Sequence, residues 1–364
     1  MFSTDPALWA ALRGNQIGRT VATPFYLGRQ TAADLTVEQR GSLTLNADSE
    51  VQARCSITVS GKGEPLIPAR AEDPLAVYGQ EIALSREVFV RDQRFLIPHG
   101  RLNIVSADES SLRIRQGVRL DWSVELELQD RFEAIRADDF VVASTPQEAT
   151  SAYSELRRLI TAYPVVKNPA VPDCDVPAAT SYYSRMGAIQ TLCTLMGAKP
   201  ALTRDGSFCP RKADRWLTET VPDFILDGVV SFKTRMAKDY VNQVVVTSST
   251  DESVVAYAQI VDPANPLAVS RAGGRTYKYS SPLIASEAAA QAAADTILAR
   301  LSSRRARTYT VSCTPEALLL DLGDFGRVND TATGRSFLGE VSALSVPLDP
   351  TQPITVDFIV AEEL

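Results

Sequence analysis

Histidine is the scarcest of the side chains that could carry out chemistry in this sequence. The chain has one, His99, so a Ser-His-Asp or Cys-His site, and most zinc sites, would depend on it. It stands in Leu96-Ile97-Pro98-His99-Gly100, and Pro-His-Gly is typical of a turn. We therefore expect His99 to be a loop residue without a catalytic role.

The cysteines do not form a metal-binding or redox motif. They are odd in number and far apart, and none belongs to a C-x-x-C pair. Cys55 and Cys313 fall on the apolar phase of alternating runs, which is typical of small buried hydrophobic residues. The full set is Cys55, Cys174, Cys193, Cys209 and Cys313. We expect reduced thiols in a protein made in the cytoplasm.

Sequence motifs for catalysis or nucleotide binding are absent. There is no G-x-S-x-G elbow, Walker A loop, H-E-x-x-H or G-x-G-x-x-G. The chain has 44 acidic residues, and no pair of them stands out as a general acid and base. We expect a protein that is not an enzyme and that uses no cofactor or metal.

The charge balance disfavours a protein that coats nucleic acid. Lys and Arg number 37 against 44 Asp and Glu, a formal charge of −7, whereas affinity for DNA comes mainly from neutralised phosphates. An acidic wall past which DNA slides without sticking remains compatible with this charge. The start, Met1 to Pro6, lacks the regions of a signal peptide, and every apolar run is shorter than the roughly 20 residues that cross a bilayer. We expect no membrane insertion by this chain.

The elements that must position these residues begin with strands. A short helix is predicted from Pro6, with Leu8 and Leu12 on one face. From residue 20 to about 143 the apolar period is two, clearest over 51–59 and 118–128. The second run is about twice as long as a typical strand, which predicts a long hairpin or a tall barrel wall. Residues 1–143 are thus predicted to form an antiparallel β domain with a short N-terminal helix.

A small α+β domain is predicted over 144–228. Thr145-Pro146-Gln147-Glu148 has the form of a capping box, so we expect a helix from there to about Thr161. A second helix is expected over 182–196 with Gly197 ending it. Asp205-Gly206 predicts a hairpin.

The β period returns over 229–364, interrupted by one long helix. Strands are predicted near 241–246, 254–261, 339–346 and 354–360, and a helix capped by Ser286 is predicted over 287–303. At about 150 residues per domain, 364 residues suit two or three domains. The predicted fold class is mainly β with an α+β insert.

Four segments resemble the minor tail proteins of actinobacterial siphophages. Val51 to Val59 is similar to the strand that opens that family, and Asp73 to Ile82 resembles its "dlLaPyGnei" segment. Phe95 to Ile104 stands where the family has "iPlGvfrI", and Leu126 to Phe132 is similar to its "DRs" strand end. Two departures are Val77, where the family prefers proline, and Val51-Gln52-Ala53-Arg54, which keeps one of two arginines.

The later part of the chain resembles tail-tip hub proteins more loosely. The helix and hairpin from Ile189 to Pro210, then Asn242-Gln243-Val244, the alanine-rich helix and Leu322-Gly323-Asp324 follow the order of the trimeric baseplate hub of contractile phages and of the hub portion of tail-associated lysins. This resemblance implies two tail-tube-like antiparallel β-barrel or sandwich domains, 1–143 and 229–364, flanking the small helical domain. Many such hubs carry a lysin, peptidase or receptor-binding extension; because nothing follows residue 364 here, we expect a hub without one.

From the resemblance we expect a structural virion protein of a siphovirus at the tail tip. It would form a homotrimeric ring that closes the tail tube and adapts six-fold to three-fold symmetry. The implied partners are the distal tail protein ring, the tape measure protein, and tail-tip or fibre proteins. DNA would pass through without specific binding.

Six residues are candidates for contacts in such a ring. Arg119, Asp121, Glu125 and Glu127, on the polar phase of the long strand, are candidates for the channel-facing surface. Ordinary solvated strand residues would give the same pattern. Asp130 and Arg131 are candidates for an interface, although they could equally pin a strand end.

The alternative function is a β-sandwich module of a tail fibre that binds carbohydrate or a receptor. Such a module would carry exposed aromatic residues converging on a concave face. Aromatic residues make up 7% of the chain, and Tyr153, Tyr182, Tyr183, Tyr277 and Tyr279 fall in predicted helical or loop contexts.

Overall fold

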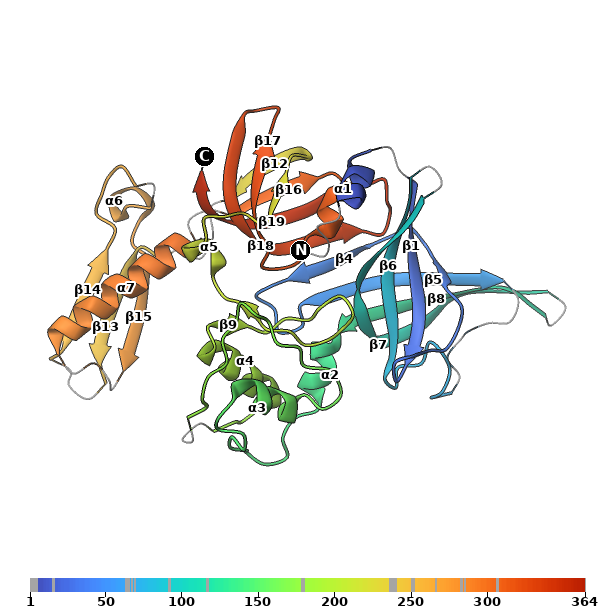
Figure 1. Ribbon diagram of the computed structural model, residues 1–364, viewed down its shortest axis with the longest axis horizontal. Coiled ribbons are helices and arrows are strands. Elements are labelled where there is room, and N and C mark those ends of the chain that lie inside the picture. Colours follow the sequence, from blue (N-terminus) through green and yellow to red (C-terminus); the bar gives the residue numbers. More distant parts are fainter. Residues whose placement is uncertain are drawn as a thin grey trace. The chain divides into compact units, whose positions relative to one another are not determined.

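The alternating runs in the first part of the chain build a closed antiparallel barrel. The computed structural model describes residues 6–14, 17–62, 66, 68, 70–90, 93–115, 118–177, 181–235, 241–249, 253–265, 267–281, 284, 286–305 and 308–363. The barrel strands are β1 (Ile17–Tyr26), β3 (Leu35–Val37), β5 (Ala53–Lys62), β6 (Gln80–Val90), β7 (Gln93–Arg115) and β8 (Val118–Asp130). In space they follow the order β3, β5, β8, β7, β6, β1, and β1 pairs with β3 to close the circle (Figure 1). A two-residue strand, β2 (Arg29–Gln30), extends β1.

The long strand predicted from residue 118 is half of a long hairpin. β7 has 23 residues and β8 has 13, and the two pair antiparallel and run out beyond the barrel (Figure 1). The predicted inward set is confirmed in the described side chains, since Ile57, Val59, Val124 and Leu126 are completely buried. The hairpin therefore has one apolar face and one wet face.

The predicted turn at His99 is wrong. Leu84 of β6 faces Gly100, and Ser85 faces Pro98, so His99 is the extra residue of a β-bulge inside β7. A bulge accommodates Pro98, which has no N–H for the sheet, and Gly100 with its φ of +139°. The apolar positions on either side, among them buried Ile97 and Leu102, keep the strand going through the bulge.

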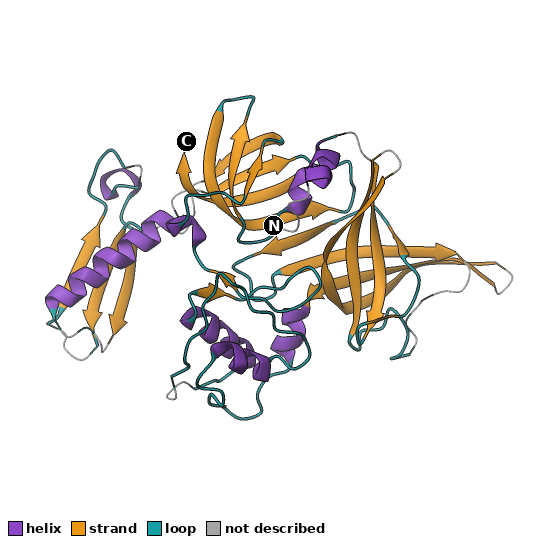
Figure 2. Ribbon diagram, in the orientation of Figure 1, coloured by secondary structure: helices purple, strands orange, loops and turns teal. Residues whose placement is uncertain are grey.

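Helices gather after the barrel, and two of the expectations for this part need correction (Figure 2). Residues 131–137, expected within the β domain, form α2 (Arg131–Ala137), because Asp130 caps it. The first expected helix is α3 (Ala152–Leu159), and it begins at 152 instead of 145. Ser151 is its N-cap, while the N–H groups of Gln147 and Glu148 donate to the buried Glu155 carboxylate.

The other elements of this part follow the predictions. α4 (Arg185–Leu195) ends before Gly197, which has a φ of +65°. The Asp205-Gly206 hairpin forms, since Cys209 N–H donates to Ala201 C=O. At the N-terminus, α1 (Pro6–Arg13) buries Leu8 and Leu12 as predicted. Further short elements are β9 (Ala198–Lys199), β10 (Arg211–Lys212) and α5 (Arg215–Thr218).

A second group of strands repeats the path of the barrel. These strands are β11 (Phe224–Leu226), β12 (Val229–Arg235), β16 (Thr308–Cys313), β17 (Phe325–Asp330), β18 (Arg335–Pro347) and β19 (Ile354–Glu363). Their spatial order is β12, β16, β19, β18, β17, β11. When the six strands of each group are numbered in chain order, both groups show the same spatial order: second, third, sixth, fifth, fourth, first. The groups differ in the pairing of the first strand, because β1 is antiparallel to β6 whereas β11 is parallel to β17.

The two groups belong to one sheet. β4 (Ser42–Asn46) pairs with β5 on one side and with β18 on the other, so that Leu45 faces Leu344. A short 3₁₀ helix, η1 (Pro315–Leu319), precedes β17 and is buried at Ala317 and Leu319.

The segment between β12 and β16 forms a small α/β structure. It holds β13 (Gln243–Ser248), β14 (Val255–Gln259), α6 (Val269–Ala272), β15 (Thr276–Ser281) and α7 (Glu287–Arg305), the last confirming the predicted long helix. β13 lies between β14 and β15. Its core joins Val244 and Val246 of β13 to Ala290 and Ala294 of α7.

The contacts within the chain define two compact units. The first comprises Met1–Ser231, Val311–Val356 and Ala361–Leu364, and the second comprises Phe232–Thr310 and Asp357–Val360. The mainly β fold class with a barrel is thus as predicted. The three domains with boundaries at 143 and 228 stay a prediction.

Candidate functional site

The wet face of the long hairpin carries two of the candidate channel residues. Glu125 and Glu127 are exposed on β8, alternating with Val124, Leu126 and Leu128, which are buried. Arg119 and Asp121 belong to the same strand, but their side chains lie outside the part of the structure that is described.

This face is acidic where β7, β8 and β5 lie side by side. Asp108 of β7 stands directly opposite Glu125, and both are exposed. Ser56 of β5 donates from Oγ to Glu125 Oε1 at 3.2 Å, and Glu127 lies between Ser56 and Ser106 in register. Carboxylates facing each other across two strands repel each other. Together these charges make this part of the face repel other anions.

Asp130 lies where β8 ends and α2 begins. Its Oδ2 accepts from Ala53 N–H at 2.6 Å and its Oδ1 accepts from Phe132 N–H at 2.9 Å, so one carboxylate joins β5 to the first turn of α2. Burial raises the pKa of Asp130 to about 6, although these N–H groups favour the ionised form.

Arg131 makes a buried ion pair with Glu81 of β6. Nε donates to Glu81 Oε1 at 2.6 Å and Nη2 donates to Oε2 at 2.7 Å, a bidentate arrangement. Nη1 donates to Gly206 C=O at 2.7 Å, and the guanidinium lies 4.3 Å from the centre of the Tyr163 ring. Gly206 has a φ of +86°, and a Cβ there would lie 2.7 Å from Arg131 Nη1. The hairpin therefore needs glycine at this position both for its turn and for this contact.

Asp130 and Arg131 thus form an interface inside the chain. The two residues are 4% and 6% exposed, and they connect the barrel to the segment of helices and loops that follows it. Contact of these residues with a second chain stays a prediction.

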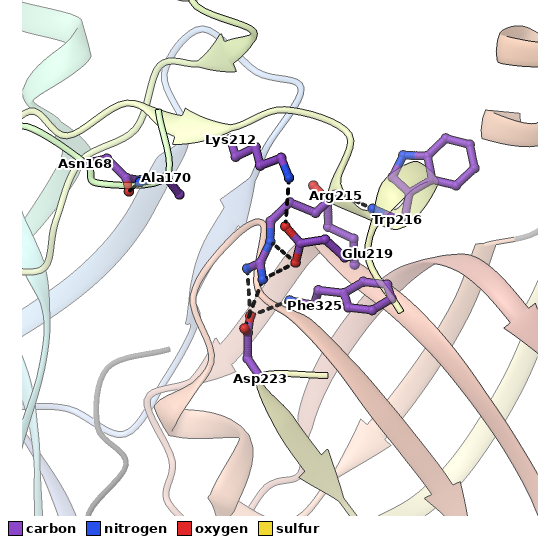
Figure 3. A network of polar contacts seen from close by, with 9 residues as sticks. Asn168, Ala170, Lys212, Arg215, Trp216, Glu219, Asp223 and Phe325 are labelled. Atoms are coloured by element: carbon purple, nitrogen blue, oxygen red, sulfur yellow. Dashed lines mark hydrogen bonds and ion pairs between the residues drawn. The ribbon is translucent and has the colours of Figure 1, made fainter. Parts of the chain in front are cut away.

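A second ionic cluster surrounds Arg215 (Figure 3). Arg215 donates to Glu219 Oε2 from Nε at 2.8 Å and to Asp223 Oδ2 from Nη1 at 2.6 Å, and Lys212 also donates to Glu219. Asp223 in turn accepts from Phe325 N–H at 3.1 Å. Burial opposes the charge of Arg215, but the two carboxylates raise its pKa. The cluster ties residues 212–223 to the start of β17.

Some classes of site are missing from the part of the chain that is described. No group of three or more His, Cys, Asp or Glu side chains there has the geometry to hold a metal ion. No helix among those residues is long and apolar enough to span a membrane. Cys55 and Cys313 are buried as predicted, and burial raises the pKa of Cys55 to about 12.

Residues 187–344 match a family model whose description reads "Putative phage tail protein". Together, this match and the fold support a structural phage tail protein. The fold is that of the 43 kDa tail protein of prophage MuSo2 from Shewanella oneidensis, with a TM-score of 0.58 and 11% identity over 94% of this chain and 98% of that chain. A tail protein from Neisseria meningitidis MC58 gives a TM-score of 0.54 and 14% identity over 94% of this chain and 96% of that one. No curated protein matches the sequence.

Phage tail proteins are virion components, and the two solved tail proteins match this one over nearly their whole length. The comparison therefore covers the barrel, the helical part and the second strand group together.

The sequence prediction missed Glu81, the partner of Arg131 in this chain. Glu81 lies in a strand whose neighbouring residues Ile82 and Leu84 are completely buried, and it is itself only 5% exposed. A carboxylate at a buried strand position signals a buried partner. The sequence alone could not identify that partner, because it lies 50 residues further along the chain.

Proposed function

We propose that this phage tail protein is a tail-tip hub that forms a homotrimeric ring. The ring closes the tail tube, adapts six-fold to three-fold symmetry and lets DNA pass. The observation that supports this proposal is the strand path shared by the barrel and by the second group of strands.

The shared path gives one chain two similar β structures. Three copies of such a chain carry six of them, so a trimer can meet a six-fold ring on one side and a three-fold tip on the other. A chain with a single β structure of this kind would offer a trimer only three equivalent surfaces. The parallel pairing of β11 makes the two structures similar without making them identical.

The acidic hairpin face suits the wall of the channel. In the proposed ring Arg119, Asp121, Glu125 and Glu127 face the lumen, where negative charge keeps DNA from sticking. The net charge of −7 agrees with passage without specific binding. The protein acts without catalysis, with the distal tail protein ring and the tape measure protein above it and tip or fibre proteins below.

The exposed tyrosines argue against the alternative of a carbohydrate-binding fibre module. Tyr257 shares a register position with Val245, whereas Tyr277 and Tyr279 are in register with Val244 and Val246. Because neighbours along a strand point to opposite faces, Tyr257 lies on the other face of the small sheet from Tyr277 and Tyr279. These aromatic residues do not converge on one face.

The test is the mass of the purified full chain by light scattering, alone and with its neighbouring tail ring. We expect three times the chain mass of 39.5 kDa, and ring-shaped particles with a central channel in negative stain. A chain that stays monomeric under both conditions would contradict the hub, and polysaccharide binding by that monomer would favour the fibre module.

A further inference from the structure

A small cavity with charged and apolar lining lies in the first unit, beside the bulge in β7. Its volume is about 90 Å³, and its lining includes His99, Arg101, Asp130, Thr203, Arg204 and Arg211. Thr203, on the hairpin, is exposed, so the cavity lies next to the surface. Leu45 and Leu344, from the paired strands β4 and β18, supply apolar lining.

Arg211 is the unusual member of this lining. All three of its guanidinium nitrogens are buried, and none has a hydrogen-bond partner within the described structure. Glu340, Asp48 and Asp324 act on it only through their charges, while burial lowers its pKa. A buried guanidinium without a partner costs several kcal/mol, so a site that retains one is expected to supply an anion from outside.

His99 adds a second unpartnered polar atom. Its Nε2 is buried and makes no hydrogen bond to the described residues. Burial, and then the charges of Arg204 and Arg86, lower the pKa of His99 well below its usual value, so the ring is neutral. A neutral imidazole can carry its proton on Nε2 and donate from there.

The other charged groups of the lining have contacts of their own, and the Arg101 guanidinium lies 4.4 Å from the centre of the Phe25 ring. Arg204 donates to Asp321 Oδ1, Pro98 C=O and Leu320 C=O, and Asp130 accepts from two backbone N–H groups. The acceptors are therefore in use, whereas donors on Arg211 and His99 are not. The cavity lacks an acceptor.

We propose that this cavity binds a carboxylate, with Arg211 as its cationic donor and His99 as its neutral donor. The planar fork of a guanidinium matches the two oxygens of a carboxylate. One unpaired cation suits a monoanion, whereas a phosphate dianion would bring more charge and more acceptors than these two donors meet. The cavity volume of about 90 Å³ is enough for a small carboxylate head.

The carboxylate could be a free small anion or an Asp, Glu or chain end of a neighbouring tail protein. The site itself does not depend on the proposed hub, because it lies within one chain.

His99 provides the measurement, because it is the single histidine of the chain. The full chain, labelled with ¹⁵N-histidine, is titrated with sodium acetate at constant ionic strength while the His99 ring resonances are followed by NMR. We expect a saturable shift at Nε2 with acetate and none with sodium chloride. Arg211→Gln should weaken acetate binding by about tenfold or more, as expected for loss of charge-assisted hydrogen bonds. Arg29→Gln, an equal charge change at an exposed residue, should leave it unchanged.

Two further probes distinguish the sources of the carboxylate. The capped peptide Ac-Gly-Glu-Gly-NH₂, compared with its glutamine counterpart, represents a side chain of a partner protein. Binding of the glutamate peptide supports a protein source, and binding of acetate alone supports a free anion.

If the His99 resonances of the wild-type chain do not shift with acetate, the proposal is overturned, and the cavity holds water instead of a carboxylate. Equal affinity for inorganic phosphate and acetate would overturn the choice of a carboxylate. If Arg211→Gln does not fold, Arg211→Lys keeps the charge while removing the fork, and unweakened acetate binding by that variant would also contradict the assignment.

Discussion

Arg131 and Arg136 lie on the same short helix, α2, yet their ion pairs differ in burial. The pair of Arg131 with Glu81 is buried on both sides, whereas the Arg136 side chain, paired with Glu133, is 50% exposed. Arg131→Met would leave Glu81 charged and buried without its partner, so we expect the free energy of unfolding to fall by about 3–5 kcal/mol. Arg136→Met, the matched control, should lower the free energy of unfolding only slightly. Denaturant unfolding followed by tryptophan fluorescence measures both, and equal losses would contradict this account.

Asp130 makes stability depend on pH in a direction opposite to that of most carboxylates. Its pKa in the folded chain is about 6, above the ordinary 3.8, so the folded state binds the proton more tightly than the unfolded state. Below about pH 4 the protonated Asp130 stabilises the folded state fully. As the pH rises through 6 this stabilisation is lost, and the free energy of unfolding falls by about 3 kcal/mol. We expect the wild-type chain to lose stability relative to Asp130→Asn between pH 4 and pH 6. A difference between the two unfolding free energies that does not change with pH would rule this out.

At the scale of elements, two pairs of neighbouring strands share one packing feature. In each pair an aromatic ring of one strand packs against a glycine of the other. A Cβ at Gly61 of β5 would lie 2.4 Å from Trp122 Cζ2 of β8, and a Cβ at Gly326 of β17 would lie 2.2 Å from Phe224 Cζ of β11. In both cases the aromatic residue and the glycine are direct partners in the sheet register. The ring covers the strand where the glycine has no side chain.

Gly61→Ala is therefore expected to displace the Trp122 ring and to cost about 1–3 kcal/mol of unfolding free energy. The tryptophan emission should change as well, because Trp122 is only 4% exposed in the barrel. Gly14→Ala, where a Cβ would meet nothing closer than 3.6 Å, is the control and should behave like the wild type. If both variants unfold at the same denaturant concentration, the close approach seen at Gly61 does not constrain the barrel.

At the scale of the whole molecule, the small α/β structure is an insertion into the second strand group. β12 and β16 flank it in sequence and are neighbours in the sheet. The three tryptophans, Trp9, Trp122 and Trp216, all belong to the first unit. Replacing residues 241–305 with a short flexible linker should leave the tryptophan-detected unfolding midpoint close to that of the full chain. Loss of a cooperative transition would show that the first unit needs the insertion in order to fold.

The acidic hairpin face is expected to control how fast DNA passes through the assembled particle. Glu125→Lys with Glu127→Lys would turn a repulsive wall into one that holds phosphate, and DNA should leave purified particles more slowly. The control is Glu50→Lys with Glu72→Lys, which makes the same charge change at two other exposed acids. Normal release from the first variant, in particles that assemble fully, would count against a lumen position for β8.

The sequence by itself determined the local structure of this protein. Alternation of apolar and polar residues identified β5 and β8, because a strand places successive side chains on opposite faces wherever it lies in the fold. Caps and apolar spacing identified α1, α4 and α7 for the same local reason. The capping signal failed at α3: the Glu155 carboxylate, within the helix, accepts from the N–H groups of residues 147 and 148, and α3 begins later than its capping motif predicts.

The tertiary structure alone decided which segments meet. Leu45 faces Leu344, and Glu81 pairs with Arg131, and in both cases the partners are far apart along the chain. Alternation defines the face that a strand buries without defining its neighbour, so the path shared by the two strand groups could not be read from local pattern. The unpartnered guanidinium of Arg211 is likewise a property of the folded chain, since an arginine becomes costly to leave unpaired only once folding has removed its water.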